Sequence, residues 1–170
     1  MPVFLKKEQI DRQGKEVEEF RSKLFKEKYL SQVQAFPLVR ELFERIKANR
    51  KKIALASSAK GDELSTYKRL AGISDLIEAE TTSDDAEKSK PHPDFLLAAL
   101  DRLGKISCDR VIVVGDSPYD AKAARKASIS TIGMLSGGFP ESALLASGCI
   151  TVYKDSADLL QHYTQSPLVK

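Results

Sequence analysis

Two aspartates stand four positions apart, directly after a run of β-branched residues. The run is Val111 to Val114, Gly115 ends it, and Asp116 and Asp120 follow. This order, continued by the helix-like segment AKAARKA, predicts a buried strand, a loop and a helix of a parallel sheet. Ligands bind at the carboxyl ends of such strands. Two carboxylates held together there repel unless a cation lies between them, and Mg²⁺ is commonly bound by one or two carboxylates and a phosphate.

The alternative for this pair is structural. Asp is a favoured residue at helix N-termini, so Asp116 and Asp120 would then only cap the loop and the following helix. The pair alone does not decide between a metal site and a pair of caps.

Two further groups suit the binding of a phosphate. Ser57 and Ser58 end the apolar segment IALA, where a hydroxyl and the N–H groups that open the next helix can hold a phosphate; a helix-capping serine is the alternative. Lys90 lies between a loop and a proline-started helix, although a lone lysine before a proline is usually solvated surface. Hydroxyl, cation and paired carboxylates together are what a phosphoryl-transfer site needs.

The elements that must position these groups form one alternating series. We expect an α/β fold with a Rossmann-like parallel sheet and helices on both of its faces. In the helix opened by Pro37, the pattern predicts that Leu38, Leu42 and Ile46 face inward, along with Val39 and Phe43. Strands are predicted at 52–57, 76–80, 111–114, 130–135 and 150–153, and helices at 16–30, 62–70, 93–103 and 120–127, with others starting at 37, after 140 and at 155.

Composition limits the class of protein. The 170 residues suit one domain with a small appendage, with 42% hydrophobic and 30% charged residues. No apolar stretch approaches the 18 or so residues of a membrane span, and the N-terminus does not read as a signal peptide, so we expect a cytoplasmic protein without a membrane partner. The net charge of +3 is spread among acids and gives no support to nucleic-acid binding. Cys108 and Cys149 lack the spacing of a zinc site.

Three of these segments, in this order, resemble the haloacid dehalogenase superfamily. IALASS is similar to its second motif, KPHPD to its third and VVGDSPYDAKAARKAS to its fourth, and the likeness is to the subgroup of phosphoglycolate phosphatases and β-phosphoglucomutases. The resemblance implies that Ser57, beside Ser58, binds the transferring phosphoryl group and that Lys90 neutralises it and orients the nucleophile. It also implies that Asp116 ligates Mg²⁺ with Asp120 in support, and that the substrate is a small phosphorylated metabolite.

The first motif of that superfamily, a strand ending in Asp-x-Asp, is absent from these 170 residues. Asp11 follows no apolar strand, and Gln13 occupies the second position after it. Residues 1–34 instead resemble part of the helical cap that the family inserts between its first two motifs. We therefore expect a remnant of the cap at 1–34 and, at 35–170, a core that lacks its first strand. Leu38 stands where relatives often carry glycine.

Two functions follow from this pattern. The first is a Mg²⁺-dependent phosphatase that forms an aspartyl-phosphate on an aspartate outside the sequence given. The alternative is a catalytically inactive phosphate-binding or regulatory protein of the same family. Without its first strand, the core would expose the facing edges of two interior strands, and we expect it to be molten or to close this gap. The sequence fixes neither the substrate nor the oligomeric state, and we expect His92 and His162 at the surface.

Overall fold

The chain divides into two compact units, Met1–Gln34 and Ala35–Lys170. The computed structural model describes residues 7–85 and 90–169. In the first unit, helix α1 (Lys7–Lys28) is followed by a 3₁₀ turn, Leu30–Gln32, so the helix begins well before the predicted residue 16. Phe20 on this helix is 68% exposed. None of the described helices combines the length and the apolar character that a membrane crossing requires.

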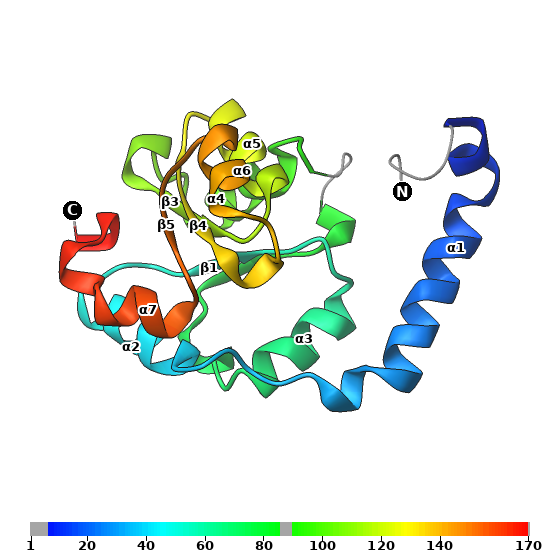
Figure 1. Cartoon of the computed structure of the whole chain (residues 1–170), viewed down its shortest axis with the longest axis horizontal. Helices are drawn as coiled ribbons and strands as arrows, with labels where there is room; N and C mark the ends of the chain where they lie inside the picture. Colours follow the sequence, from blue (N-terminus) through cyan, green and yellow to red (C-terminus); the bar gives the residue numbers. More distant parts are fainter. Residues whose placement is uncertain (1–6, 86–89, 170) are drawn as a thin grey trace. The chain divides into compact units, whose positions relative to one another are not determined.

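Strands and helices alternate along the second unit, which confirms the predicted α/β class (Figure 1). Most predicted elements are present, with bounds that differ by a few residues. The helices are α2 (Val39–Ala48), α3 (Gly61–Leu70), α4 (Asp94–Arg102), α5 (Pro118–Lys126), α6 (Glu141–Ser147) and α7 (Ser156–Gln161), and the strands are β1 (Ala54–Ala56), β2 (Ala79–Thr81), β3 (Ile112–Gly115), β4 (Ser130–Met134) and β5 (Cys149–Tyr153).

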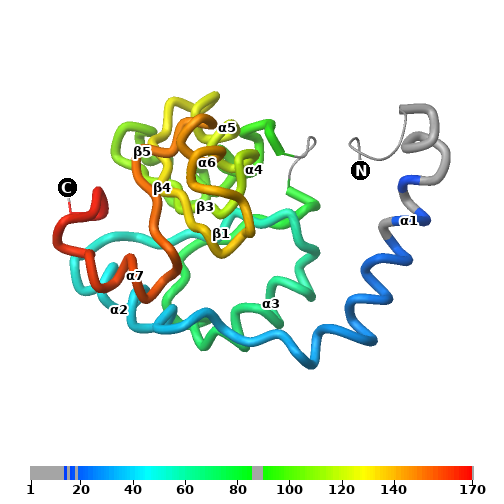
Figure 2. The backbone as a smooth tube through the Cα atoms, in the orientation of Figure 1, coloured from blue at the N-terminus to red at the C-terminus, as the bar shows by residue number. Residues whose placement is uncertain are grey.

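The strands form two parallel sheets where the sequence predicted one. Strands β1 and β2 pair with each other, and β3, β4 and β5 form a second sheet with β4 in the centre (Figure 2). Strands β1 and β3 are not hydrogen-bonded to each other, so each keeps one edge without a strand partner among the described residues. The expected gap is therefore not closed by pairing between these two strands. Two other partners are expected to close it: the segment MPVFL, which lies outside the described residues, and a second copy of the chain, which stays a prediction.

Helices cover both faces of the three-stranded sheet. On one face, Leu42 of α2 and Leu159 of α7 pack with Ile132 and Met134 of β4 and with Tyr163. On the other face, buried residues of α4 and α5 form a second cluster, and α5, α6 and β5 form a third around Ala121, Leu144 and Cys149. Ala56 of β1 packs against the same cluster as Val113 of β3. Thus α4 and α5 connect the two sheets.

The predicted burial of two residues, Leu38 and Val114, is wrong. Leu38 has φ +54° and is 48% exposed, so α2 begins only at Val39 and Leu38 does not face inward. Val114 is 45% exposed although the sequence predicted a buried strand. Because β3 lies at the edge of its sheet, no described strand continues the layer beyond Val114.

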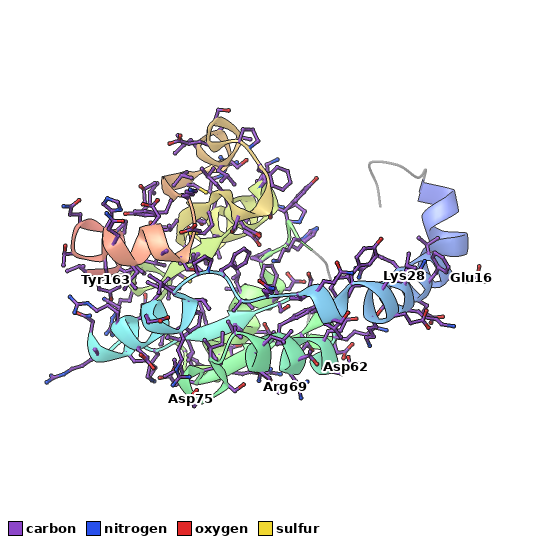
Figure 3. All side chains as sticks on the ribbon, turned by 60° about the horizontal axis from the view of Figure 1, so that its bottom comes forward. Glu16, Lys28, Asp62, Arg69, Asp75 and Tyr163 are labelled. Atoms are coloured by element: carbon purple, nitrogen blue, oxygen red, sulfur yellow. The ribbon has the colours of Figure 1, made fainter. Side chains whose placement is uncertain are left out.

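Charged residues explain the limits of α3. Asp62 and Glu63 lie in its first turn and Lys68 and Arg69 in its last, which complements the helix dipole (Figure 3). Gly72, with φ +65°, then ends the helix.

Two hydrogen bonds of 2.9 and 3.0 Å join Arg40 of α2 to Asp75, and this guanidinium lowers the pKa of Asp75.

Candidate active site

The turn from β3 into α5 fixes Asp120 through a capping box. Ser117 is the N-cap, and its Oγ accepts a hydrogen bond from the Asp120 N–H at 3.3 Å. In return, Asp120 Oδ2 accepts hydrogen bonds from the Ser117 N–H at 3.1 Å and from its hydroxyl at 2.6 Å. Pro118 occupies the first helical position, where its missing N–H costs nothing. Asp120 is consequently buried, with 7% of its surface exposed.

Lys90 lies beside this aspartate. Its Nζ is 2.6 Å from Asp120 Oδ1, and it also lies 4.8 Å from the centre of the Phe95 ring. A cation over an aromatic face is attracted by the ring quadrupole, so Phe95 helps to hold the ammonium in place. The lysine that precedes α4 and the aspartate that opens α5 therefore meet, although 30 positions separate them (120 − 90).

Asp116 completes a group of two carboxylates and one ammonium. Much of Asp116 is exposed, yet burial of part of its carboxyl group raises its pKa above the ordinary value of 3.8. The negative charge of Asp120 raises this pKa further, while a hydrogen bond from the Asp116 backbone and, to a smaller extent, the charge of Lys90 oppose the shift. Asp116 is thus a carboxylate whose negative charge is poorly compensated by the described residues.

Gly115 leaves space for Asp120 at the end of β3. A Cβ atom on Gly115 would lie 2.5 Å from Cβ of Asp120 and 2.9 Å from its carboxyl carbon. Real Cβ atoms do not approach so closely, so any other residue would push Asp120 from its place. Neither Ser117 nor Gly115 was among the predicted site residues. The spacing of Ser117 and Asp120, a serine with an acid three positions later, was the signal that could have revealed the capping box.

Ser57 and Ser58 follow β1, as predicted, but neither caps the helix, because Lys60 is the N-cap of α3. The Ser57 N–H donates to the Thr81 carbonyl at 3.0 Å, which extends the pairing with β2, and Ser57 Oγ accepts from the Ala59 N–H at 3.0 Å. Ser58 is exposed. Among the described residues, no hydrogen bond or ion pair joins Ser57 to Lys90, Asp116 or Asp120.

The residues present fit a Mg²⁺ ion in part. Within the described ranges, no group of three or more His, Cys, Asp or Glu side chains lies close enough to hold a metal. Of the predicted pair, Asp120 already uses Oδ1 for Lys90 and Oδ2 for Ser117, which leaves Asp116 as the available ligand. One carboxylate with phosphate and water oxygens is a coordination that Mg²⁺ accepts. The predicted division of roles, with Asp116 as ligand and Asp120 in support, stays a prediction.

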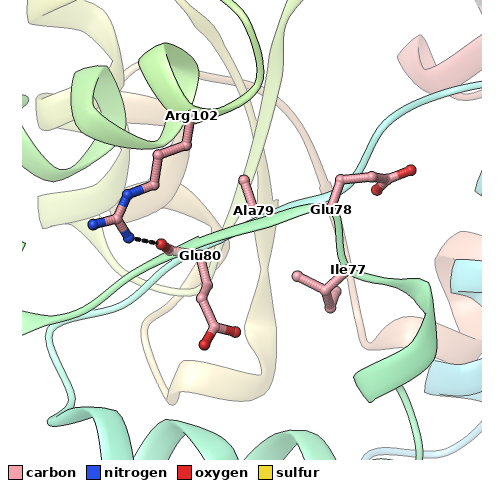
Figure 4. Close-up of a pocket in the computed structure, with 5 residues that line it drawn as sticks. All are labelled: Ile77, Glu78, Ala79, Glu80 and Arg102. Atoms are coloured by element: carbon pink, nitrogen blue, oxygen red, sulfur yellow. Dashed lines mark hydrogen bonds between the residues drawn. The ribbon is translucent and has the colours of Figure 1, made fainter.

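A cleft of about 310 Å³ lies along β2 (Figure 4). Ile77, Glu78, Ala79, Glu80 and Arg102 line it, so it contains none of the predicted site residues. Its charged groups have partners: Glu78 pairs with Lys47, Glu80 with Lys68, and Arg102 bonds both the Glu80 carbonyl and Asp85. These ion pairs leave little charge for a ligand.

The other candidate residues lie at the surface or in the core. His92 is exposed, and His162 Nδ1 lies 2.9 Å from both the carbonyl and the carboxylate of Asp158 on its own helix. Cys108 and Cys149 are free thiols.

Comparison with known proteins places this geometry in a family. The profile of the haloacid dehalogenase-like hydrolases matches residues 3–134. A phosphorylated carbohydrates phosphatase of Thermotoga maritima is 29% identical over 159 residues, which span 91% of this chain and 71% of that protein. A phosphoglycolate phosphatase of Rhodospirillum rubrum is 33% identical over 88 residues, or 52% of this chain and 36% of that protein.

A solved structure agrees with the sequence matches. The crystal structure of a hydrolase from Pseudomonas syringae matches with a TM-score of 0.79 and 29% identity, covering 96% of this chain and 73% of that one. The chain therefore spans only part of each of these relatives. The family match covers most of the chain and confirms the resemblance read from IALASS, KPHPD and VVGDSPYD: the chain belongs to the haloacid dehalogenase-like hydrolases.

Proposed function

We propose that this chain carries the phosphate-binding and metal-binding parts of a Mg²⁺-dependent phosphatase that acts on a small phosphomonoester. The observation that carries the proposal is the 2.6 Å contact between Lys90 and Asp120, beside a second carboxylate at the end of β3. A lysine and metal-binding carboxylates are the groups that neutralise a phosphate during transfer. Two relatives are named as phosphatases of phosphorylated small molecules, which supports this substrate class.

Each predicted residue has a role in this proposal. Asp116 would ligate Mg²⁺, which supplies positive charge for the phosphate oxygens. Asp120 acts through its neighbours: it orients the Lys90 ammonium and, with Ser117, fixes the turn that carries Asp116. Ser57, with the exposed Ser58, would hold the phosphate at the end of β1. Lys90 would neutralise the phosphate and orient the attacking group.

The attacking group in this proposal is an aspartate that forms an aspartyl-phosphate, which water then hydrolyses. No Asp-x-Asp occurs in the 170 residues. The unpaired edges of β1 and β3 are where a strand that carries this motif would pair. Such a strand would bring its terminal aspartates to the residues that follow β1 and β3.

The test compares the phosphatase activity of the 170-residue chain with that of a chain extended by an Asp-x-Asp strand. We expect the 170-residue chain to hydrolyse p-nitrophenyl phosphate with Mg²⁺ at background rate, since loss of a nucleophile costs about a million-fold in turnover in other hydrolases. Extending the chain upstream with an apolar strand that ends in Asp-x-Asp should restore activity. The matched control is the same extension with the first aspartate replaced by asparagine. Robust turnover by the unextended chain that is lost in Asp116→Ala would show that another residue attacks.

The absence of Asp-x-Asp from these residues also favours a second candidate, a catalytically inactive phosphate-binding or regulatory protein. This candidate predicts that inorganic phosphate binds to the chain and that the extended chain remains inactive. The coding sequence upstream of the Met1 codon gives an independent test, because an in-frame strand ending in Asp-x-Asp-Gly would support the phosphatase.

A further inference from the structure

The loop that follows β4 reaches Asp116. Strands β3 and β4 are parallel neighbours, with Gly115 paired to Gly133, so the residues that leave their carboxyl ends meet at the same edge of the sheet. Asp116 is the first residue after β3. Strand β4 is followed by the 3₁₀ turn Leu135–Gly137, which ends at Gly138.

Gly137 lies so close to Asp116 that a side chain at position 137 would not fit. A Cβ atom at this position would lie 2.1 Å from the Asp116 carbonyl oxygen, 2.9 Å from its carbonyl carbon and 2.8 Å from its carboxyl carbon. Unlike Gly138, Gly137 does not have a positive φ, so its backbone conformation does not call for glycine. The space beside Asp116 is therefore the reason for a glycine at position 137.

A hydrogen bond from the Asp116 backbone and the packing around the residue together orient the Asp116 carboxylate. Among the described residues, no side chain donates a hydrogen bond to it, whereas Asp120 has both oxygens bonded. On one side of Asp116, the capping box fixes the next residue, Ser117. On the other side lies Gly137, where an added Cβ atom would collide with both the backbone and the carboxyl carbon of Asp116.

We propose that Gly137 is a positioning residue, which holds the Asp116 carboxylate in the orientation that metal binding needs. The proposal rests on the proposed role of Asp116 as a Mg²⁺ ligand. Gly137→Ala would force the loop and Asp116 apart, since a Cβ cannot lie 2.1 Å from a carbonyl oxygen. Residues that orient a metal ligand typically contribute about 10- to 100-fold to metal affinity.

The neighbouring glycine provides the matched control. Gly138 has φ +77° and no atom within 4 Å of a Cβ placed on it. Gly138→Ala therefore strains the same loop without touching Asp116. We expect Mg²⁺ affinity, measured by amide shifts during titration of the whole chain with Mg²⁺, to fall at least about tenfold in Gly137→Ala and to stay within about twofold in Gly138→Ala.

NMR shifts measured without metal test the positioning role of Gly137 separately from the proposed phosphatase function. In the metal-free chain, Gly137→Ala should shift the NMR resonances of the Asp116 carboxyl and of the Ser117 amide, and Gly138→Ala should leave them in place. If the unsubstituted chain binds no Mg²⁺ while these shifts occur, the proposed function fails and the positioning contact stands. Equal shifts in the two variants, or equal Mg²⁺ affinities in the substituted and unsubstituted chains, would overturn the positioning role.

The unsubstituted chain offers a second measurement in case Gly137→Ala does not fold. A nuclear Overhauser contact between the α-protons of Gly137 and the β-protons of Asp116 is expected if the two residues pack as described. Its absence in the folded chain would overturn the proposal without any variant.

Discussion

Leu38 has a left-handed backbone conformation, φ +54° and ψ +25°, that L-residues avoid at a cost of about 1–2 kcal/mol. Its side chain is about half exposed, so little burial opposes its removal. We expect Leu38→Gly to raise the free energy of unfolding by about 0.5–1 kcal/mol, since glycine relieves the strain but adds freedom to the unfolded chain. Thermal denaturation followed by circular dichroism measures this change.

The control for that substitution is Leu38→Ala, which removes the same exposed side chain and keeps the strained backbone. It should gain no stability. If Leu38→Ala stabilised the chain as much as Leu38→Gly, the exposed leucine side chain and not the backbone would be the cause.

Asp116 makes stability depend on pH. Because its folded-state pKa is raised, the folded chain binds a proton more tightly than the unfolded chain, and stability is lost as the pH rises from 3.8 through the raised folded-state pKa. Asp116→Asn should remove this loss. Since solvent screens an exposed carboxylate, we expect a gain of only about 1–2 °C in the melting temperature at pH 7 without metal, and none at pH 3.

Thermal melts of both chains from pH 3 to pH 7 measure this difference. A variant that melts below the unsubstituted chain at pH 7 would show that the Asp116 carboxylate stabilises the fold, contrary to the raised pKa.

Strand β1 has one paired and one unpaired edge. The Ser57 N–H points to β2, and since N–H groups alternate along a strand, that of Leu55 does as well, while those of Ala54 and Ala56 point away. We expect hydrogen exchange to be at least about tenfold faster at Ala54 and Ala56 than at Leu55 and Ser57. The central strand β4 provides the protected reference. Equal protection of all four amides in a monomer would mean that the open edge of β1 is covered.

Local sequence signals explain why most helices and strands could be predicted. Hydrophobic periodicity, together with Gly72, was sufficient for most helices and strands of the second unit, because these signals act within a few residues. Pro118, the first residue of α5, was not used, and the predicted helix began at residue 120. The capping box of Ser117 and Asp120 was equally local. The contact between Lys90 and Asp120 was not readable from spacing; the chemistry that a phosphoryl-transfer site needs and the resemblance to a family suggested that the two belong to one site.

The wrong predictions concern features that depend on contacts between residues far apart in the sequence. The split into two sheets and the exposure of Val114 reflect which strands become neighbours, and no local pattern encodes this. The left-handed backbone of Leu38 was unpredictable from its own type, because leucine normally avoids that region. The contact of Gly137 with Asp116 depends on two loops at the same sheet edge, which a glycine within SGGFP does not reveal.

At the scale of the whole molecule, the core belongs to the second unit. In the part of the chain that the structure describes, the three clusters of buried apolar side chains consist of residues between 42 and 168. We therefore expect a chain that starts at Ala35 to melt within about 2 °C of the full chain. A chain that starts at Lys51 should not fold, because it lacks Leu42 and Ile46 of the first cluster, and loss of each large core side chain costs about 2–5 kcal/mol. Differential scanning calorimetry of the three chains tests this division.

Arg102 covers part of the outer edge of β2. Its guanidinium occupies the Glu80 carbonyl on the side of β2 away from β1, and Asp85 holds it there. Exposed strand edges recruit further strands, and repeated recruitment on two sides of a sheet builds a fibril. Because Arg102 takes one carbonyl of the outer edge of β2, we expect a further strand to pair with the β1–β2 sheet at β1 rather than at β2. Growth of that sheet from β2 would then need Arg102 to leave the Glu80 carbonyl.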